Sequence, residues 1–341
     1  MDLETLLTTV YVLISDWYKK EIEMNKPTRP GPKPRLTDSE VLTLAVVGQW
    51  RVGVPWRSER GLVRWALGSE GSKLFPKMLH RSQFNERVRD LYGVLVRLQQ
   101  YLAEQLATIE DIYECVDCEP LPAFSNGQAH REAGHWLFES TTGKGGTTGG
   151  FFYGDHLLAA VLPSGAVTGW VLASAYIQDR WVLEALISGR AGHFQLIGPP
   201  ARTRHAKSKR PTPPLGFVGP PSAVGASKRR PYLADRGFNG QRWQTHWQQH
   251  YGVTVIAVPP DNSPHSSAWL PVHKRWLAAH RQIVDTVFSW LDGVFGMKRL
   301  NAHSRWGQLT RIAAKMAAYN MGLFLNRMLN RPAGALETLI C

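Results

Sequence analysis

Hydrophobic residues recur every three or four positions through residues 1–108, a period that predicts helices throughout this part of the chain. Thr37-Asp38-Ser39-Glu40 has the pattern of a capping box directly before the apolar run 41–47, so a helix is expected to begin there. Phe84 and later apolar residues at helical spacing predict a longer helix over 82–106. We therefore expect an all-helical N-terminal domain.

After residue 110 the pattern changes to short apolar runs typical of strands, which alternate with helical segments. Strands are predicted over 111–117, 156–162, 166–173, 231–235 and 253–258, with a turn at Pro163-Ser164-Gly165 between the second and the third. Helices are predicted over 179–188, 241–250 and 278–295, with a final amphipathic helix around 309–323. This order indicates a mixed α/β domain over 109–330, followed by a tail at 331–341.

Two segments combine prolines with basic residues and are not expected to form regular structure. Residues 26–35 could be either an arm that contacts DNA or a solvated linker. Residues 199–231 carry eight prolines and eight Lys or Arg residues, with too few large apolar side chains to fold alone. We interpret this second segment as a basic insertion in the α/β domain.

The charge of the chain indicates which class of partner the protein binds. The chain of 341 residues has 40 Lys and Arg against 27 Asp and Glu, a formal net charge of +13. A basic excess of this size favours a polyanionic partner, and nucleic acid is the leading candidate. With 43% hydrophobic residues the chain has enough apolar material for a folded core, which excludes a disordered protein.

Several classes of site and location are not expected. The acidic N-terminal residues and the lack of ~18 to 20 consecutive apolar residues argue against a leader or a membrane span, so we expect a cytoplasmic, nucleoid-associated protein. No glycine-rich phosphate loop is followed by Lys and Ser or Thr, so no nucleotide cofactor is implied. Cys115, Cys118 and Cys341 are odd in number and lack a second pair at zinc spacing, so we interpret them as reduced thiols.

Three aspartates within apolar segments are the candidate catalytic residues. Asp117 and Asp235 follow predicted strands, and Asp285 lies inside a predicted helix. A cluster of like charges repels itself, so it is expected where divalent cations neutralise it, and oxygen ligands favour Mg²⁺ or Mn²⁺. Two such ions can catalyse attack on a phosphodiester. Taken singly, Asp117 and Asp235 could instead cap turns, and Asp285 could pair with Arg281 one helical turn earlier.

Four stretches resemble the DDE transposases of bacterial insertion sequences, and most closely the insertion-sequence family numbered nine-eight-two. They are Leu-Thr-Asp-Ser-Glu-Val-Leu-Thr-Leu at 36–44, Val-Asp-Cys-Glu-Pro-Leu-Pro at 116–122, Tyr-Leu-Ala-Asp-Arg-Gly-Phe at 232–238, and Arg281-x-x-x-Asp285-Thr-Val-Phe-Ser-Trp-Leu. The resemblance extends over roughly residues 1–330. It implies that residues 109–330 form an RNase H-like catalytic domain, with Asp117, Asp235 and Asp285 as the catalytic acids that hold two Mg²⁺ or Mn²⁺ ions.

The resemblance also implies a transposase that binds the terminal inverted repeats of its element, cleaves phosphodiester bonds and joins the ends to target DNA. Double-stranded DNA is then the partner, and a homodimer is expected because two ends must be brought together. The helices within 1–108 could form a module that recognises these ends, or a structural bundle. We expect contacts with the DNA backbone from Lys33, Arg35, Arg202, Arg204, Lys207, Lys209, Arg210, Lys228, Arg229, Arg230, Arg281, Lys298 and Arg299.

The chain departs from the family pattern at two positions. Asp285 stands where the family ordinarily has Glu, and Asp292 stands where related groups have Lys. Asp292 could be a substitute ligand or a solvated residue near Lys298 and Arg299. Two alternative functions therefore stay open: a DNA-binding relative of the same fold with impaired catalysis, and a stand-alone metal-dependent nuclease.

Overall fold

The computed structural model describes residues 1–25, 34–125, 140–144, 150–192, 230–259, 262–263, 269–302 and 304–340. The chain divides into two compact units. Unit 1 comprises Met1–Leu102, Trp290–Ala302 and Trp306–Cys341, and unit 2 comprises Ala103–Ser289 with His303–Arg305. Residues 290–302 and 306–330, which the sequence analysis assigned to the α/β domain, thus pack with the N-terminal helices.

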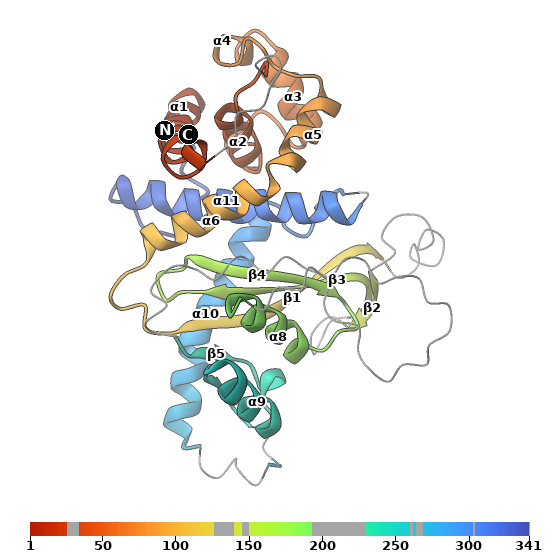
Figure 1. Cartoon of the computed structure of the whole chain (residues 1–341), viewed down its shortest axis with the longest axis vertical. Helices are drawn as coiled ribbons and strands as arrows, with labels where there is room; N and C mark the ends of the chain where they lie inside the picture. Colours follow the sequence, from red (N-terminus) through yellow and green to blue (C-terminus); the bar gives the residue numbers. More distant parts are fainter. Residues whose placement is uncertain are drawn as a thin grey trace. The chain divides into compact units, whose positions relative to one another are not determined.

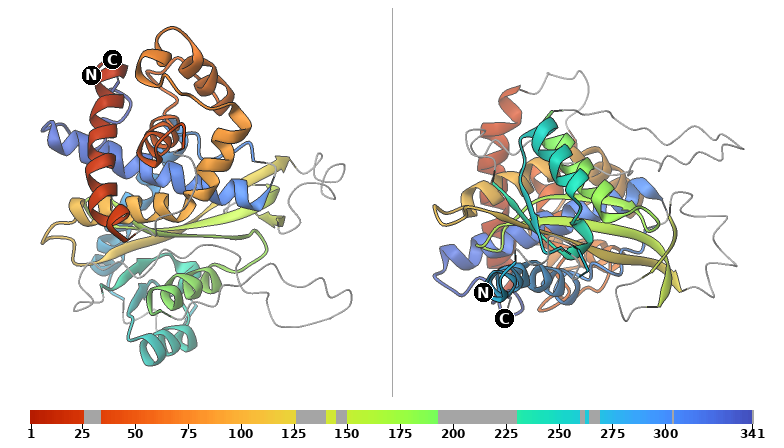
Figure 2. Two further views of the ribbon diagram at one scale, coloured as in Figure 1. Left: turned by 45° about the horizontal axis from the view of Figure 1, so that its top comes forward. Right: turned by 90° about the horizontal axis from the view of Figure 1, so that it is seen from below.

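Unit 1 is helical in its described residues. Its elements are α1 (Leu3–Glu21), η1 (Glu23–Asn25), α2 (Asp38–Val47), α3 (Glu59–Leu67), α4 (Gly71–Leu74), α5 (Arg81–Asp90), most of α6 (Tyr92–Leu106), the end of α10 (Pro271–Gly293) and nearly all of α11 (Arg305–Met328). The two ends of the chain meet in this unit (Figure 2), where the Met1 amino group donates to the Leu339 carbonyl at 2.9 Å. Leu336, Leu339 and Ile340 are buried, so these residues of the predicted tail belong to the core of unit 1.

The predicted capping box is confirmed at the start of α2. The Thr37 hydroxyl accepts from the Glu40 amide, and the Glu40 carboxylate accepts from the Thr37 amide. The helix predicted over 82–106 is instead two helices, because the backbone at Leu91 leaves the helical conformation, with φ −92° and ψ 10°. Apolar spacing continues through this break, so periodicity alone could not reveal it.

Unit 2 contains a mixed α/β arrangement around one curled sheet (Figure 1). Its elements are β1 (Glu114–Ser125), β2 (Thr141–Lys144), β3 (Phe151–Val161), β4 (Val167–Ser174), α8 (Asp179–Arg190), β5 (Tyr232–Ala234), η2 (Arg236–Phe238), α9 (Gln241–Tyr251), β6 (Val255–Ala257) and α10 as far as Ser289. The order β2-β3-β1-β5-β6 places β1 in the centre, and β4 also pairs with β3. The strands β3, β4 and β1 are antiparallel, whereas β1, β5 and β6 are parallel.

Alternation along β1 separates the two faces of the sheet. Val116 joins a buried apolar cluster formed with residues of α8 and α9, which cover one face. Its neighbour Cys115 points to the opposite face, where its thiol donates to the His280 carbonyl of α10 at 3.3 Å. Asp117 has the same parity as Cys115, so the sequence directs its carboxylate toward α10.

The predicted α/β class is confirmed, with differences at the ends of elements. The hairpin is found as predicted, and Gly165 takes a φ of 88° in its turn. The first strand begins at Glu114 rather than 111, because the Asp111 carboxylate accepts from the Thr108 amide and holds a turn there. α10 begins at Pro271 rather than near 278, and proline is well suited to a first helical position. In the part of the chain that the structure describes, no helix is both long and apolar enough to cross a bilayer.

Candidate active site

Asp117 and Asp235 come together because two parallel strands reach the same level. Val116 of β1 pairs with Ala234 of β5, so the next residues in both strands are the two aspartates. Asp235 directly follows β5 and precedes η2, but its side chain makes no capping hydrogen bond there. Ligand sites in α/β sheets commonly lie beyond the carboxyl ends of such strands.

A single arginine bridges the two carboxylates. Nη2 of Arg281 lies 2.9 Å from Oδ2 of Asp117, and Nη1 lies 3.3 Å from Oδ1 of Asp235. The side chain of Arg281 is only 17% exposed, whereas that of Asp235 is 55% exposed. From the sequence, Arg281 was expected to pair with Asp285 or to contact DNA, but the structure places its guanidinium between the two strand-end aspartates.

Asp285 lies one helical turn after Arg281 on α10 and is exposed. Its charge raises the pKa of Asp117, so the third aspartate is within electrostatic range of the first. The structure therefore brings all three predicted acids to one region of unit 2. Only two of them share the guanidinium.

Burial dominates the protonation of Asp117. It raises the pKa of this carboxyl to about 6, against an ordinary value of 3.8. Arg281 and the Cys118 amide, which donates to Oδ1 at 2.8 Å, lower this pKa, whereas Asp235 and Asp285 raise it. The site thus holds more negative charge than its surroundings solvate well, which favours the binding of a cation.

The three aspartates supply the oxygen ligands that Mg²⁺ and Mn²⁺ prefer. Within the described ranges, however, no group of three or more His, Cys, Asp or Glu side chains is arranged to hold a metal ion. The guanidinium of Arg281 already pairs with the carboxylates of Asp117 and Asp235. The donor chemistry therefore fits a divalent cation, but this arrangement of side chains requires Arg281 to give way first.

Most of the predicted DNA-contacting residues fall outside the described part of the chain: Lys33, Arg202, Arg204, Lys207, Lys209, Arg210, Lys228 and Arg229. Arg35, Lys298 and Arg299 are exposed. Arg230 instead donates through Nε to the Asp111 carbonyl. Asp292 accepts from the Lys298 amide at 3.0 Å, so this aspartate shapes the turn after α10.

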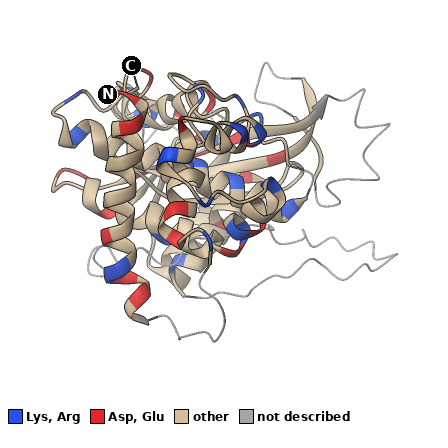
Figure 3. Ribbon diagram, turned by 90° about the horizontal axis from the view of Figure 1, so that it is seen from above, with Lys and Arg blue, Asp and Glu red and all other residues tan. Residues whose placement is uncertain are grey.

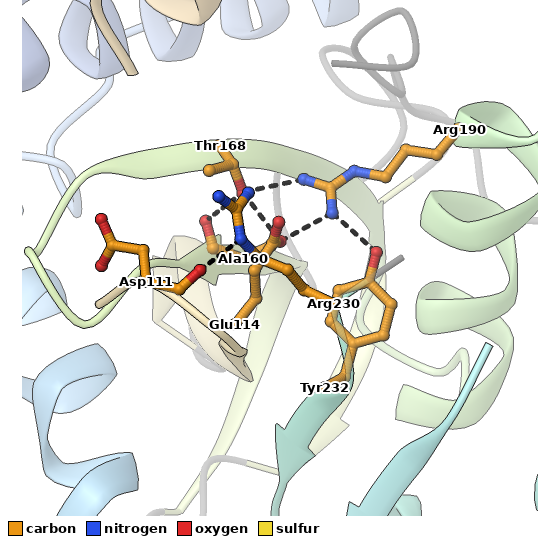
Figure 4. A network of polar contacts seen from close by, with 7 residues as sticks. All are labelled: Asp111, Glu114, Ala160, Thr168, Arg190, Arg230 and Tyr232. Atoms are coloured by element: carbon orange, nitrogen blue, oxygen red, sulfur yellow. Dashed lines mark hydrogen bonds and ion pairs between the residues drawn. The ribbon is translucent and has the colours of Figure 1, made fainter. Parts of the chain in front are cut away.

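A buried polar network at the start of β1 was not predicted from the sequence (Figure 4). Nη1 of Arg190 lies 2.6 Å from Oε2 of Glu114 and also donates to the Tyr232 hydroxyl at 2.6 Å. The Thr168 hydroxyl donates to the same Glu114 oxygen at 2.9 Å. These residues come from α8, β1, β4 and β5, so only the folded sheet reveals that they are partners.

The described cysteines are free thiols, as expected. Burial raises the pKa of Cys115 to about 12, and it also raises the pKa of Cys118, which lies near Asp179. Because thiolates are the reactive form, neither thiol is expected to react in the folded protein.

A Cys341→Ser variant should show no reaction with Ellman's reagent at pH 8 until denaturant is added. Immediate release of one equivalent in native buffer would contradict this prediction.

Comparison with known proteins adds no relative: no family model, no curated protein and no solved structure matches the chain.

Proposed function

We propose that this protein is a DNA transposase of the DDE type, with an RNase H-like catalytic unit. The observation that carries the proposal is the meeting of Asp117 and Asp235 at Arg281, on the helix that also carries Asp285. The central position of β1, with antiparallel strands on one side and parallel strands on the other, is compatible with such a unit. The net charge of +13 supports a nucleic acid as substrate.

In this proposal Asp117, Asp235 and Asp285 hold the divalent cations. When bound, these ions would activate a water or a 3′-hydroxyl and stabilise the leaving oxygen of the phosphodiester. Arg281 is the counterion of Asp117 and Asp235, and its guanidinium would be suited to contact a substrate phosphate at this site. Double-stranded DNA, comprising the element ends and the target, is the proposed substrate, and a homodimer would hold two ends together.

A second candidate is a DNA-binding relative with impaired catalysis. Two observations favour it over a simple nuclease: Asp285 is a shorter acid than the family pattern has, and the carboxylates of Asp117 and Asp235 are already paired with Arg281. This candidate predicts binding to the element ends without cleavage in Mg²⁺ or Mn²⁺.

The deciding experiment incubates the purified chain with Mg²⁺ or Mn²⁺ and duplex DNA containing the sequences that flank the reading frame. Cleaved and joined products would support the transposase, cleavage without joining a stand-alone nuclease, and retention without cleavage the impaired relative. Chelation by EDTA should abolish all cleavage.

Asp235→Asn should abolish cleavage while DNA binding remains, because the substitution removes a proposed ligand and leaves a half-exposed side chain of the same size. Gel electrophoresis of labelled products and fluorescence anisotropy of the same duplex measure the two properties. Asp90→Asn, at an exposed position of α5, is the matched control and should cleave normally. Normal cleavage by Asp235→Asn would remove this residue from the site.

A further inference from the structure

We propose that unit 1 contains a second nucleic-acid site, an arginine cluster of Arg51, Arg57 and Arg311 that binds a backbone phosphate of duplex DNA. This inference rests on the proposed function for the identity of its partner. It assigns phosphate binding to residues that lie apart from the three aspartates in the sequence and in a different compact unit.

Arg51 and Arg311 contact the segment 294–301, which leads from α10 to α11, and Arg57 donates through Nη1 to the Arg51 carbonyl at 2.6 Å. The Arg51 amide donates to the Val294 carbonyl at 2.9 Å, and Nζ of the buried Lys315 of α11 donates to the Phe295 carbonyl. Arg311, one turn earlier on α11, donates to the Leu300 carbonyl at 2.7 Å. Three basic residues from two regions of unit 1 therefore hold one segment through its backbone.

The backbone of this segment turns at Gly296, next to the Arg51 side chain. Gly296 has a φ of 63°, and a side chain at this position would begin 3.7 Å from Cγ and Nε of Arg51. The close approach places the Arg51 side chain against the same turn that Lys315 binds. Carbonyl oxygens accept from the side chains of Arg311 and Lys315, but these oxygens carry no net charge to neutralise the cluster.

Arg51 shows the resulting shortage of negative charge most clearly. Its Nη1 atom is buried and has no hydrogen-bond partner among the described residues. Burial lowers the pKa of Arg51, and the charges of Arg311 and Arg57 lower it further. A buried guanidinium nitrogen that faces other cations is unfavourable unless an anion completes its surroundings.

The surrounding charges do not remove this excess. Burial also lowers the pKa of Arg311, as do Arg81 and Arg89, while Glu59 raises it from 3.8 Å away. The Glu59 carboxylate is shared with the side-chain amide of Asn85. Asp292 also acts on this region, because it raises the pKa of the neighbouring Lys315. The two acids face a larger number of arginines, and Figure 3 shows where Lys, Arg, Asp and Glu lie along the ribbon.

The type of anion follows from the side chains. Arginine presents a planar fork of donors that matches two phosphate oxygens and remains charged at all relevant pH values. Arg51 and Arg311 are partly exposed and Arg57 is exposed, so an anion can reach the cluster from solvent; Arg299 is exposed as well. A repeating phosphodiester backbone satisfies both conditions, because one phosphate can bind Arg51 while neighbouring phosphates meet the exposed cations.

The experiment measures the affinity of the full chain for a labelled duplex by fluorescence anisotropy, over a series of salt concentrations. Arg57→Ala is the first variant, because this residue is exposed and its removal should not affect folding. We expect weaker binding and a decrease of about 0.9 in the slope of log K against log salt for each phosphate that the variant no longer neutralises. Arg60→Ala, at an exposed position on α3, is the matched control and should keep the wild-type slope.

A second measurement tests the buried member of the cluster without DNA. Inorganic phosphate should raise the melting temperature of the wild type more than chloride does at equal ionic strength, and this difference should shrink in Arg51→Gln. Circular dichroism confirms that the variant is folded, and the Arg57→Ala comparison stands if it is not. Wild-type affinity and slope in Arg57→Ala, or equal effects of Arg57→Ala and Arg60→Ala, would overturn the site.

The result also separates this site from the proposed catalysis. Loss of affinity in Arg57→Ala, in a protein that never cleaves DNA, would support the cluster and reject the transposase activity. Absence of duplex binding by the wild type would overturn the cluster itself.

Discussion

Replacing Asp117 with Asn is expected to raise the free energy of unfolding at pH 7.5, although it removes a proposed catalytic residue. The ionised carboxylate is destabilised by burial, and a folded-state pKa of about 6 against an ordinary 3.8 corresponds to about 3 kcal/mol. Asn has nearly the same shape and needs no ionisation. Active sites commonly retain destabilising groups of this kind because activity requires them.

The pH dependence follows from the direction of the pKa change. Between about pH 4 and pH 6 the native state retains the Asp117 proton and the unfolded state loses it, so wild-type stability falls as pH rises. Above pH 6 both states are ionised and the loss is complete. The advantage of Asp117→Asn should therefore be small at pH 4, increase up to about pH 6 and stay constant above it.

Urea denaturation in EDTA at pH 4.5 and pH 7.5 measures this difference. Asp16→Asn, at an exposed position of α1, is the control and should show no such growth with pH. If a divalent cation binds the aspartates, adding Mg²⁺ should stabilise the wild type at pH 7.5 and leave Asp117→Asn unchanged. A variant that loses stability equally at both pH values would show that burial does not destabilise the Asp117 carboxylate.

Replacing Glu114 with Leu should have the opposite effect and lower the free energy of unfolding by about 3 to 5 kcal/mol. The substitution leaves Arg190 without its carboxylate in a place where the Arg190 side chain is only 15% exposed. Burial lowers the pKa of Arg190, whereas Glu114 raises it, and the net result is a raised pKa. The charged form of Arg190 is therefore stabilised by Glu114. Hydrogen exchange of the β1 and β4 amides reports the destabilisation within unit 2.

The matched control for this prediction is the double variant Glu114→Leu/Arg190→Met. Removing both charges leaves no unpaired ion, so the double variant should recover most of the stability that the single variant loses. If the two variants were equally unstable, packing rather than the buried charge would explain the loss.

Local signals in the sequence predicted the elements whose cause is local. The capping box at Thr37 and the Pro-Ser-Gly turn before Ala166 lie within a few residues of the structure that they specify, and both predictions are confirmed. The break at Leu91 and the start of β1 at Glu114 depend on interactions that periodicity does not contain.

The candidate site shows the same limit. Asp117 and Asp235 were predicted to meet because strand ends mark positions in a sheet, and the structure brings them together. The sequence could not predict that Arg281 pairs with Asp117 rather than with Asp285. Asp285 is four residues away on the same helix, while Asp117 is 164 residues away. Long-range ion pairs such as Arg190–Glu114 carry no signature in the order of residues.

Arg190 and Arg230 lie on either side of residues 193–229, and each makes a hydrogen bond near the start of β1. Arg190 closes α8 and donates to the Glu114 carboxylate at the start of the central strand, whereas Arg230 precedes β5 and donates to the Asp111 carbonyl in the turn before that strand. Closing a longer or shorter connection between fixed ends changes the entropy only slowly with length. A change in the length of this connection should therefore cost little stability in the sheet that carries the aspartates.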